Sequence, residues 1–314
     1  MHQSGLQAFI PFYTSTLSTL KPDRPLINPT INSEYPFEIS DKIYFHKESV
    51  INPSIYDDKY SFAYPTQVAK NIFIKEGYKD TIFNLINKSP LKEIGKYKYS
   101  DLGYIYLQRI SENIYSEGLD DIAQNNFYTG LGMNNTLFNP LTRFELNRIV
   151  PTENDILFRK QIIRGYVHDP TAAMMGGVAG HAGLFSNAND LAKLMQMYLQ
   201  KGTYGGTRYF NPETIKLFTS QPKENNGNRR GLGFDKPETR KDKQSPVCES
   251  ASASSFGHSG FTGTMVWVDP EYNLIYIFLS NRVHPDASNN KLVEMNIRTK
   301  IQEVFYQAIK KSQK

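Results

Sequence analysis

The sequence of 314 residues contains a single cysteine, Cys248, and a single tryptophan. One cysteine excludes a disulfide within the chain. The purely apolar runs are only a handful of residues long, too short to cross a bilayer, so no membrane span is expected. The six histidines form neither a His-Glu-x-x-His pattern nor a His-x-x-x-His pair, which argues against a metal site.

Dense runs of one charge are also missing. The chain has 36 basic and 31 acidic residues spread along its length, for a net charge of +5. This distribution indicates a solvated surface and no nucleic-acid partner. A glycine-rich stretch, residues 176–183, has neither the Gly-x-Gly-x-x-Gly spacing nor the Lys-Ser or Lys-Thr pair of a phosphate-binding loop, and we expect tight turns there.

Residues 256–283 predict a β-hairpin at the centre of a sheet. Two runs rich in β-branched and aromatic residues, 264–268 and 274–279, flank the turn-forming residues 269–273. Neither run alternates cleanly between apolar and polar residues, so both are expected to be central strands buried on two faces. The polar triplet His258-Ser259-Gly260 stands just ahead of the first run, where it can form one wall of an active site.

Helices are predicted elsewhere. The spacing of Leu102, Ile105 and Ile110 indicates a helix that starts near Ser100 or Asp101, both good N-cap residues. Other helices are expected over 67–87, in two pieces broken near Gly77, over 119–129, from Ser186 to Gly202, and over 290–310. The last helix should bury a stripe made of Val293, Ile297, Ile301, Val304, Phe305 and Ala308. Residues 21–66 lack periodicity and predict an irregular excursion, and residues 231–235 are a short strand candidate.

Several short motifs occur in the order found in one protein family. They are His2-Gln3-Ser4-Gly5-Leu6, Tyr99-Ser100-Asp101, His168-Asp169, the segment Gly-His-Ala-Gly-Leu-Phe-Ser at 180–186, and His258-Ser259-Gly260. Each motif alone is weak, but their joint order resembles the serine β-lactamase-like and penicillin-binding proteins. That group includes class C β-lactamases, D-alanyl-D-alanine carboxypeptidases and related esterases. The chain looks most similar to the module that some proteins carry behind a glycoside hydrolase family 3 domain.

The resemblance implies an α+β fold of the β-lactamase/transpeptidase type, with an antiparallel sheet flanked by helices, and no cofactor. It also implies roles for six residues. Tyr99 would transfer protons, with Asp101 where asparagine is usual, and His258 would stand at the position of the cation on the substrate strand. Ser259 and Gly260 would complete that strand, and the N–H of Phe261 would donate to the oxyanion. Outside these roles, His181 could be a ligand or a base but is expected to satisfy carbonyls around a turn, and His168-Asp169 could be a base and its orienter but is expected to anchor a loop. The alternative for His258 is that it only caps the strand.

The nucleophile of such proteins, the serine of Ser-x-x-Lys, precedes the His-x-Ser-Gly-Leu turn, which here begins at residue 2. The pattern recurs at Ser18, Ser89, Ser220 and Ser288, but two copies contain proline, Ser288 suits an N-cap, and Ser18 follows the turn beside Pro22. We therefore expect no nucleophile in this chain. The expectation is one incomplete, N-terminally truncated domain over 1–314, without the nucleophile helix and the strands before it. Its helical and loop part would cover about 1–220, and its hairpin and last helix about 230–314.

Two functions from different classes follow from this reading. The first is a fragment of a serine hydrolase that acts on ester, amide or cell-wall peptide bonds through an acyl-enzyme and is inactive on its own. The second is a non-catalytic module that binds cell-wall glycan or peptide beside a glycosidase. The expected partners are a small-molecule or peptide substrate and a glycoside hydrolase domain. A purely structural remnant is the weakest alternative.

Overall fold

The computed structural model describes residues 2–20, 23–40, 42–222 and 228–313. Its α-helices are α1 (Tyr78–Lys88), α2 (Leu102–Tyr115), α3 (Leu119–Ala123), α4 (Pro170–Met174), α5 (Ala188–Leu199), α6 (Pro212–Thr219), α7 (Lys291–Glu294) and α8 (Ile297–Ser312). A π-helical turn, Gln124–Tyr128, continues α3, and short 3₁₀ turns occupy Phe12–Thr16, Pro140–Thr142 and Leu146–Arg148.

The strands pair antiparallel in small sheets. They are β1 (Leu17–Thr19), β2 (Ile27–Asn28), β3 (Phe37–Ser40), β4 (Ile43–Phe45), β5 (Ser49–Ile51), β6 (Tyr56–Asp57), β7 (Thr66–Ala69), β8 (Ile72–Ile74), β9 (Leu137–Phe138), β10 (Pro151–Asp155), β11 (Gln161–Arg164), β12 (Leu184–Phe185), β13 (Thr203–Tyr204), β14 (Thr207–Arg208), β15 (Phe256–Ser259), β16 (Met265–Asp269) and β17 (Leu274–Phe278). Within these described ranges no helix has the length and apolar character that a bilayer span requires.

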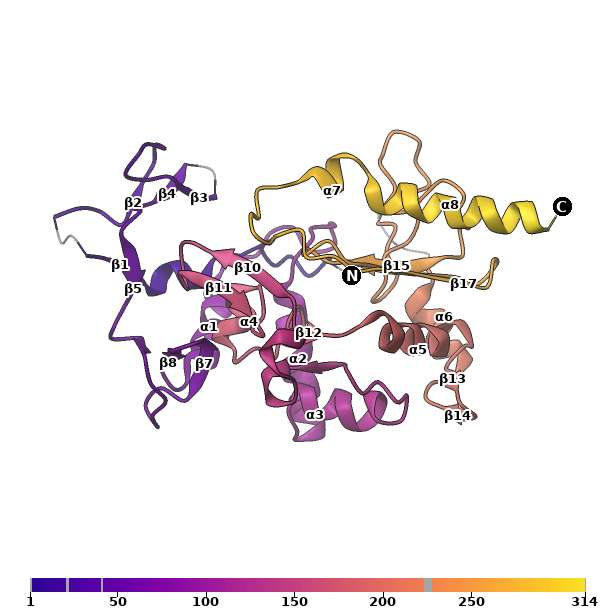
Figure 1. Cartoon of the computed structure of the whole chain (residues 1–314), viewed down its shortest axis with the longest axis horizontal. Helices are drawn as coiled ribbons and strands as arrows, with labels where there is room; N and C mark the ends of the chain where they lie inside the picture. The colour runs from indigo at the N-terminus through magenta and orange to yellow at the C-terminus, as the bar shows by residue number, and fades with distance from the viewer. Residues whose placement is uncertain (1, 21–22, 41, 223–227, 314) are drawn as a thin grey trace.

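The predicted hairpin is β16 and β17, and it forms a three-stranded sheet in the order β15-β16-β17. The sheet lies between two helical layers, with α8 on one side and α5 with α6 on the other (Figure 1). Trp267 and Val268 of β16 are fully buried. The prediction of a central strand is therefore right for β16. It is wrong for β17, which has no neighbour beyond β16 among the described residues and is buried only at Tyr276.

The interface between α8 and the sheet depends on a buried carboxylate. Asp269, at the end of β16, accepts hydrogen bonds from the Tyr306 hydroxyl of α8 (2.6 Å) and from the N–H of Ser252 (2.8 Å). Tyr276 of β17 donates its hydroxyl to the carbonyl oxygen of Arg298, also in α8 (2.9 Å). These bonds hold α8 on β16 and β17, the two strands of the sheet next to the one, β15, that leads into the triplet at 258–260.

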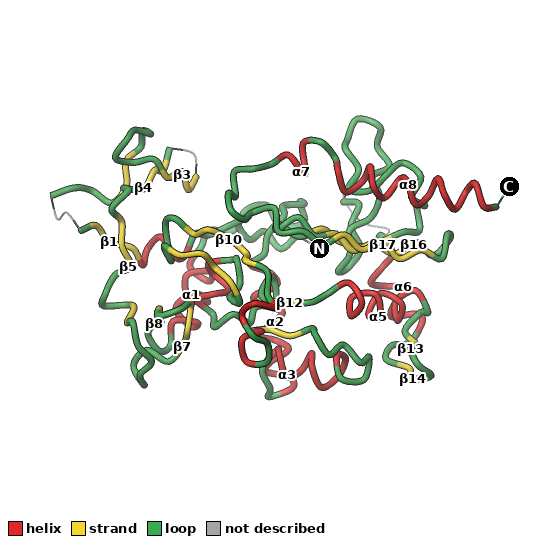
Figure 2. Tube along the Cα trace, viewed as in Figure 1, coloured by secondary structure: helices red, strands yellow, loops and turns green. Residues whose placement is uncertain are grey.

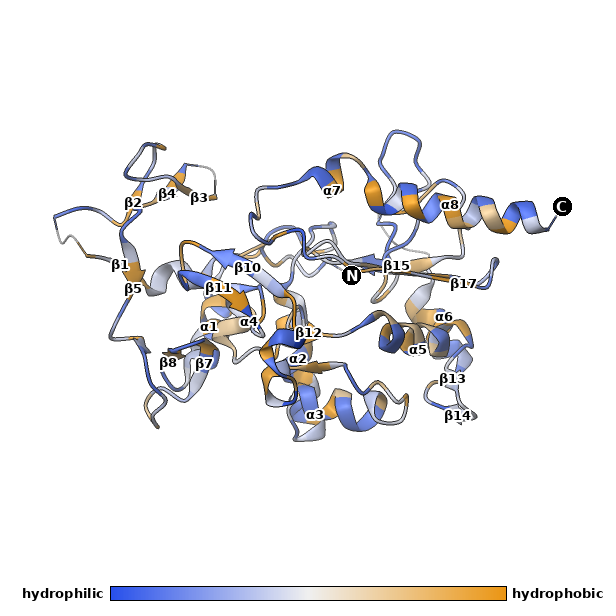
Figure 3. Ribbon diagram, viewed as in Figure 1, coloured by the Kyte–Doolittle hydropathy of each residue, from blue (hydrophilic) through white to orange (hydrophobic). Residues whose placement is uncertain are grey.

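The apolar face of α8 is not covered as the sequence predicts. Val304 is 66% exposed, Phe305 50% and Ile301 39%. The single helix predicted over 290–310 is wrong, because the chain forms two helices, α7 and α8, separated where Asn296 takes a left-handed conformation (φ 53°), and Val293 belongs to α7. The buried side chains of α8 are Gln302 and Tyr306. Figure 3 shows hydrophobic residues distributed along this helix. The periodicity identified an apolar face correctly, but the described residues of this chain do not bury it.

A larger core lies around α1, α2 and α4. It contains Ile82, Phe83 and Ile86 of α1, Leu102 and Ile105 of α2, and the small side chains of α4. The predicted start of α2 is confirmed, since Asp101 is its N-cap and the Ser100 hydroxyl accepts the N–H of Leu102 (3.3 Å). Tyr99 thus lies two residues ahead of the N-cap of α2.

The chain ahead of α1 is loop broken by short strands, as predicted for 21–66 (Figure 2). The first helical piece expected within 67–87 is wrong, because β7 and β8 form a hairpin there. Asn71 takes a left-handed conformation (φ 55°) at the Lys70-Asn71 turn, so the chain reverses where a helix would continue. The strand candidate at 231–235 contributes only a single bridge from Asp235 to Gly257, and the N-cap of α5 is Asn187 and not Ser186.

Candidate active site

Tyr99 lies where two segments distant in the sequence meet. Residues near the N-terminus run beside the approach to α2: Lys98 N–H donates to the His2 carbonyl (2.8 Å), and Ser100 Oγ donates to the Gln7 carbonyl (2.6 Å). The imidazole of His2 stacks on the Tyr99 ring at 4.3 Å between centroids. Ser100 N–H donates to His2 Nδ1 (3.1 Å), and His2 is buried. Tyr99 is therefore positioned by the His2–Leu6 motif as well as by its own helix.

Arg230 connects Tyr99 to the β15 strand. Its guanidinium carbon lies 5.2 Å from the centroid of the Tyr99 ring, within the range of a cation–π contact. Its Nη1 is 2.7 Å from His258 Nε2, and its Nε donates to the Tyr97 hydroxyl at 3.2 Å. Only 7% of Arg230 is exposed. One buried cation therefore contacts two of the predicted site residues, Tyr99 and His258, and places them on the two sides of a common site.

Asp235 holds Arg230 in this position. The carboxylate is 3.1 Å from Arg230 Nη2 and 2.8 Å from Arg229 Nη2. The backbone of Asp235 bridges Gly257 through two hydrogen bonds, Asp235 N to Gly257 O (2.7 Å) and Gly257 N to Asp235 O (3.1 Å). Because Gly257 precedes His258 in β15, the same strand fixes both the imidazole and the counter-ion of the arginine.

The contacts of His258 define its tautomer. An arginine N–H can only donate, so Nε2 accepts the bond from Arg230 and the ring proton is on Nδ1. That proton is donated to the Ser259 carbonyl at 2.7 Å. Burial, followed by the charge of Arg230, lowers the pKa of His258 below its ordinary value. The family resemblance implied a cation at position 258. The structure has a neutral imidazole there, and the positive charge beside it belongs to Arg230.

Ser259, Gly260 and Phe261 lead into a tight turn before β16. Gly260 N–H donates to the Thr264 carbonyl (2.8 Å), and Gly263 N–H donates to the Gly260 carbonyl (3.0 Å). The Phe261 ring is 63% exposed and stacks on His168 at 5.0 Å, with the Arg282 guanidinium over it. Within the described part of the chain, no acceptor is recorded for the Phe261 N–H, the group expected to donate to an oxyanion.

Asp101 faces a second pair of groups at the N-terminus of α2. Burial is the main cause that raises its pKa, with Asp169 acting in the same direction and His181 opposing both. His181 Nε2 is 2.9 Å from Asp169 Oδ1, and Asp169 also accepts the Ala172 N–H as the N-cap of α4 (2.7 Å). His181 therefore binds a carboxylate, and the prediction that it satisfies turn carbonyls is wrong. His168 pairs with Glu153 (2.9 Å), which agrees with a loop anchor.

Burial and hydrogen bonding act in opposite directions on the pKa values of the His181–Asp169 pair. Burial of His181 opposes its protonation, but the hydrogen bond to Asp169 outweighs this and raises its pKa. For Asp169, burial is again outweighed by the same hydrogen bond, so its pKa is lowered. Burial and then the Asp101 carboxylate raise the pKa of Tyr99 to about 12, although Arg230 opposes them. The Tyr99 phenol is accordingly protonated at neutral pH in this structure.

Three of the four Ser-x-x-Lys serines lie in other parts of the described fold, whereas the carbonyl oxygen of Ser220 lies close to Gly231, the neighbour of Arg230. Ser18 is in β1 opposite Val50, toward the opposite end of the molecule from β15 (Figure 1), and Lys21 falls outside the described residues. Ser89 ends α1 and donates to the Ile86 carbonyl (2.7 Å). Ser220 ends α6, and Ser288 donates to Asp286 (2.7 Å). In the described ranges none of these serines contacts Tyr99, Arg230 or His258.

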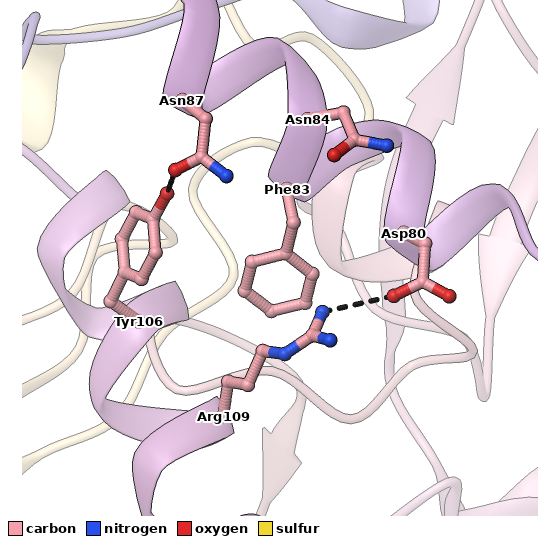
Figure 4. Close-up of a pocket in the computed structure, with 6 residues that line it drawn as sticks. All are labelled: Asp80, Phe83, Asn84, Asn87, Tyr106 and Arg109. Carbon is pink, nitrogen blue, oxygen red and sulfur yellow. Dashed lines mark hydrogen bonds and ion pairs between the residues drawn. The ribbon is translucent and has the colours of Figure 1, made fainter.

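Two surface hollows occur elsewhere. One, of about 450 Å³, lies between α1 and α2, where Arg109 pairs with Asp80 (2.9 Å) over the Phe83 ring and Tyr106 bonds Asn87 (Figure 4). The other, of about 390 Å³, lies beside β17, α5 and Phe305 of α8. Neither is lined by Tyr99, Arg230 or His258. Among the described side chains, no group of three or more His, Cys, Asp or Glu residues is placed to hold a metal ion.

Sequence reasoning missed Arg230, and it named His2 only as part of a turn motif, without its contacts to Tyr99 and Ser100. Arg230 is 133 positions from Tyr97, and His2 is 98 positions from Ser100, so no local periodicity reports these contacts. The available signal for Arg230 was the Arg-Arg pair directly before the short strand candidate Gly-Leu-Gly-Phe-Asp at 231–235.

Comparison with known proteins supplies the family. A model of the family described as Beta-lactamase matches residues 56–295. The chain belongs to the beta-lactamase family. Curated relatives from Escherichia coli K12 and Salmonella gallinarum, each named "Putative D-alanyl-D-alanine carboxypeptidase", are 33% identical over 280 residues and 35% identical over 248 residues. These alignments cover 83% and 73% of this chain, but only 61% and 55% of the relatives. This beta-lactamase-family chain thus spans about three fifths of the length of the curated proteins that it matches.

A solved structure agrees with the fold of this beta-lactamase-family chain. The LovD9 mutant of simvastatin synthase from Aspergillus terreus superposes with a TM-score of 0.51 at 17% sequence identity. The alignment covers 74% of this chain and 61% of the synthase. At this identity the likeness concerns the fold alone. The expected α+β arrangement, an antiparallel sheet flanked by helices, is confirmed.

Proposed function

We propose that this chain supplies the proton-transfer residue and the substrate strand of a serine acyl-transfer site that cleaves ester, amide or cell-wall peptide bonds. Tyr99 transfers protons, and Asp101, the N-cap of α2 two residues later, stands where asparagine is usual. His258, Ser259 and Gly260 form the strand along which the substrate lies, and the N–H of Phe261 donates to the oxyanion. The attacking serine belongs to polypeptide outside these 314 residues.

The contact of Arg230 with both Tyr99 and His258 carries this proposal. The two residues are 159 positions apart in the sequence, yet one guanidinium lies against both of them. This shared contact brings the phenol and the end of β15 close together, which supports the proposed site. The relatives named as carboxypeptidases support a substrate of the peptide class.

The proposal that the serine lies elsewhere has two supports. Within the described residues, no Ser-x-x-Lys serine contacts the cluster, and the curated relatives are substantially longer than the matched region. The high pKa of Tyr99 points the same way, because a phenol that accepts protons at neutral pH requires a nearby cation in addition to Arg230. The lysine of Ser-x-x-Lys would provide that charge.

The described part of the chain leaves an apolar surface uncovered next to the β15-β16-β17 sheet, where the proposed further polypeptide would fit. β17 is an edge strand in the described sheet, and a hollow of about 390 Å³ runs beside it between α5 and Phe305. The exposed side chains of α8, Val304 and Phe305 among them, continue the same apolar area. A paired strand and a covering helix would bury both surfaces, so we propose that further polypeptide of a longer protein, adjoining the segment that bears the serine, occupies them.

Labelling with a fluorescent penicillin tests the proposal. The 314-residue chain should remain unlabelled and should not hydrolyse nitrocefin or p-nitrophenyl acetate. The same chain extended by the polypeptide encoded in frame upstream should be labelled on a serine of that extension. In the extended protein, Tyr99→Phe should reduce labelling by about 100-fold or more, in the range of general acid–base contributions.

Tyr97→Phe is the matched control for Tyr99→Phe. It removes a neighbouring hydroxyl that bonds Arg230 but does not belong to the proposed proton path, so labelling should be largely retained. A label on any serine within these 314 residues would refute the proposal. Binding of muropeptides without turnover by the extended protein, unaffected by Tyr99→Phe, would favour the non-catalytic module instead.

A further inference from the structure

The hollow between α1 and α2 has the composition of a binding site and takes no part in the proposed function. Its volume is about 450 Å³, and side chains of the two helices face one another across it (Figure 4). Pockets that hold small molecules have volumes of about 300–1,000 Å³. The lining consists of Asp80, Phe83, Asn84, Asn87, Tyr106 and Arg109.

Each end of the hollow presents a hydrogen-bond donor beside an acceptor. At one end, Arg109 Nη1 donates to Asp80 Oδ1 (2.9 Å), and the guanidinium has further N–H groups beside the second carboxylate oxygen. At the other end, the Tyr106 hydroxyl donates to Asn87 Oδ1, which leaves the Asn87 N–H groups as donors and the phenol oxygen as an acceptor. Because a hydroxyl group both donates and accepts, each pair is complementary to a ligand hydroxyl.

The surface between the two ends is aromatic. The Phe83 ring is only 4% exposed and forms the floor, with the Arg109 guanidinium carbon 4.4 Å from its centroid. The Tyr106 ring meets Phe83 edge-on, at 5.8 Å between centroids. Asn84 lies between the two polar pairs along α1 (Figure 4), and within the described part of the chain its carboxamide makes no hydrogen bond.

The charges of the lining cancel. Asp80 and Arg109 are its two charged residues, and they pair with each other. A carboxylate or an ammonium group in the hollow would therefore meet a like charge as close as its opposite charge. This arrangement favours a neutral ligand that is rich in hydroxyl groups.

We propose that this hollow is a second binding site, and that it takes a neutral pyranose glycan. A pyranose ring combines hydroxyl groups along its edge with an apolar C–H face. The hydroxyl groups bond the Asp80–Arg109 and Tyr106–Asn87 pairs, and the C–H face lies over the aromatic floor. The Asn84 carboxamide is placed to bond a further hydroxyl or an acetamido group.

The glycan site is separate from the candidate active site and does not depend on the proposed function. Tyr106 and Arg109 follow Asp101, the N-cap of α2, by five and eight residues. At the rise of an α-helix, they lie about 7 and 12 Å from that N-cap along the helix axis. Occupation of the hollow can therefore be measured in this 314-residue chain, without an acyl-transfer step.

The first test is a ¹⁵N NMR titration of the chain with two neutral disaccharides, N,N′-diacetylchitobiose and cellobiose. At least one should bind with a Kd of roughly 1 mM, equivalent to only a few hydrogen bonds. Binding should shift the side-chain N–H signals of Asn84, Asn87 and Arg109. A preference for diacetylchitobiose would indicate an amino-sugar glycan as the source of the ligand, and equal or tighter binding of cellobiose would indicate a hexose glycan.

The second test uses substitutions at exposed helix positions. Asn84→Ala and Arg109→Ala should each weaken binding about fivefold to tenfold, as expected for the loss of one hydrogen bond. Asn113→Ala is the control for Asn84→Ala, since it removes an exposed carboxamide of α2 outside the lining. Lys79→Ala is the control for Arg109→Ala, because it breaks the other ion pair between α1 and α2, Lys79 with Glu112 (2.9 Å), without removing a residue of the lining. Both controls should keep the affinity.

Three outcomes would overturn the inference. They are no binding of either disaccharide up to about 10 mM, binding that neither Asn84→Ala nor Arg109→Ala weakens, and binding lost in Tyr99→Phe, which would place the ligand at the candidate active site. Penicillin labelling of the extended protein decides the proposed function separately. If that protein is labelled and neither disaccharide binds, only the glycan site fails. If it is not labelled and the hollow binds a disaccharide, only the proposed function fails.

Discussion

The bond between Tyr306 and Asp269 gives a quantitative prediction about how α8 is held on the sheet. Tyr306 is 1% exposed, and its hydroxyl donates to a carboxylate that is also buried. Burial, together with Asp269, raises the pKa of Tyr306, so the phenol stays protonated throughout the assay range. Tyr306→Phe removes one hydrogen bond to a charged acceptor and keeps the ring that fills the interface.

The expected cost is about 2 kcal/mol in the free energy of unfolding, within the range for hydrogen bonds to charged groups. The carboxylate would retain three donors: the N–H and hydroxyl of Ser252 and the N–H of Glu271. Tyr276→Phe is the matched control, since Tyr276 is also buried and donates across the same interface, but to the neutral carbonyl of Arg298. That substitution should cost about 1 kcal/mol.

Urea unfolding provides the measurement. Trp267 is the only tryptophan of the chain, is buried in β16, and reports on this interface through its fluorescence. Far-UV circular dichroism should give the same midpoint if unfolding is two-state. If Tyr306→Phe costs no more than Tyr276→Phe, the claim that the buried carboxylate dominates this interface is wrong.

Three further predictions concern other regions. His181 has a raised pKa in the folded chain, so its contribution to stability is complete below its unfolded pKa of about 6.5 and is lost as the pH rises through the folded value. The lowered pKa of Asp169 contributes stability above about 3.8, and this contribution is lost in acid. His181→Gln should therefore flatten the fall in stability between pH 6 and 9, measured by urea midpoints, and an unchanged slope would contradict the pairing. Gly180→Ala would place a Cβ 2.2 Å from the Tyr104 carbonyl oxygen and should lower the free energy of unfolding by about 2 kcal/mol. Gly103→Ala is the control, because its Cβ meets open space on α2 and the substitution should be neutral or stabilising. Equal thermal midpoints for the two variants would refute the close approach at Gly180. Val304→Thr should cost less than about 0.5 kcal/mol in this chain because the side chain is largely exposed, and more in the extended protein if the proposed segment covers α8, as paired denaturation curves would reveal.

Local signals in the sequence were sufficient for some elements. The start of α2 was predictable because capping at Ser100 and Asp101 and the spacing of Leu102 and Ile105 act within a few residues. The hairpin of β16 and β17 was predictable for the same reason. The β7–β8 hairpin was missed because its turn, Lys70-Asn71, lacks the glycine that usually marks a left-handed turn, although Asn71 adopts one.

Other features depend on contacts that no local pattern encodes. The spacing of Val304 and Phe305 shows that α8 has an apolar face, but not whether residues of the same chain cover it. The family motifs predicted Tyr99 and His258 as site residues. They did not predict Arg230, which lies between them, because its partners His258 and Tyr97 are 28 and 133 positions away in the sequence. The protonation of His258 followed from that arginine, so its charge could not be read from residue type alone.

The stacking of His2 on Tyr99 has a practical consequence for anyone preparing this protein. An affinity tag or fusion partner joined at the N-terminus would emerge beside the phenol, and its residues could obstruct ligands or replace the imidazole against the ring. The other end of the chain follows α8, well away from the N-terminal end (Figure 1). Purification handles therefore belong at the C-terminus, and comparisons of binding between differently tagged preparations would otherwise report on the tag.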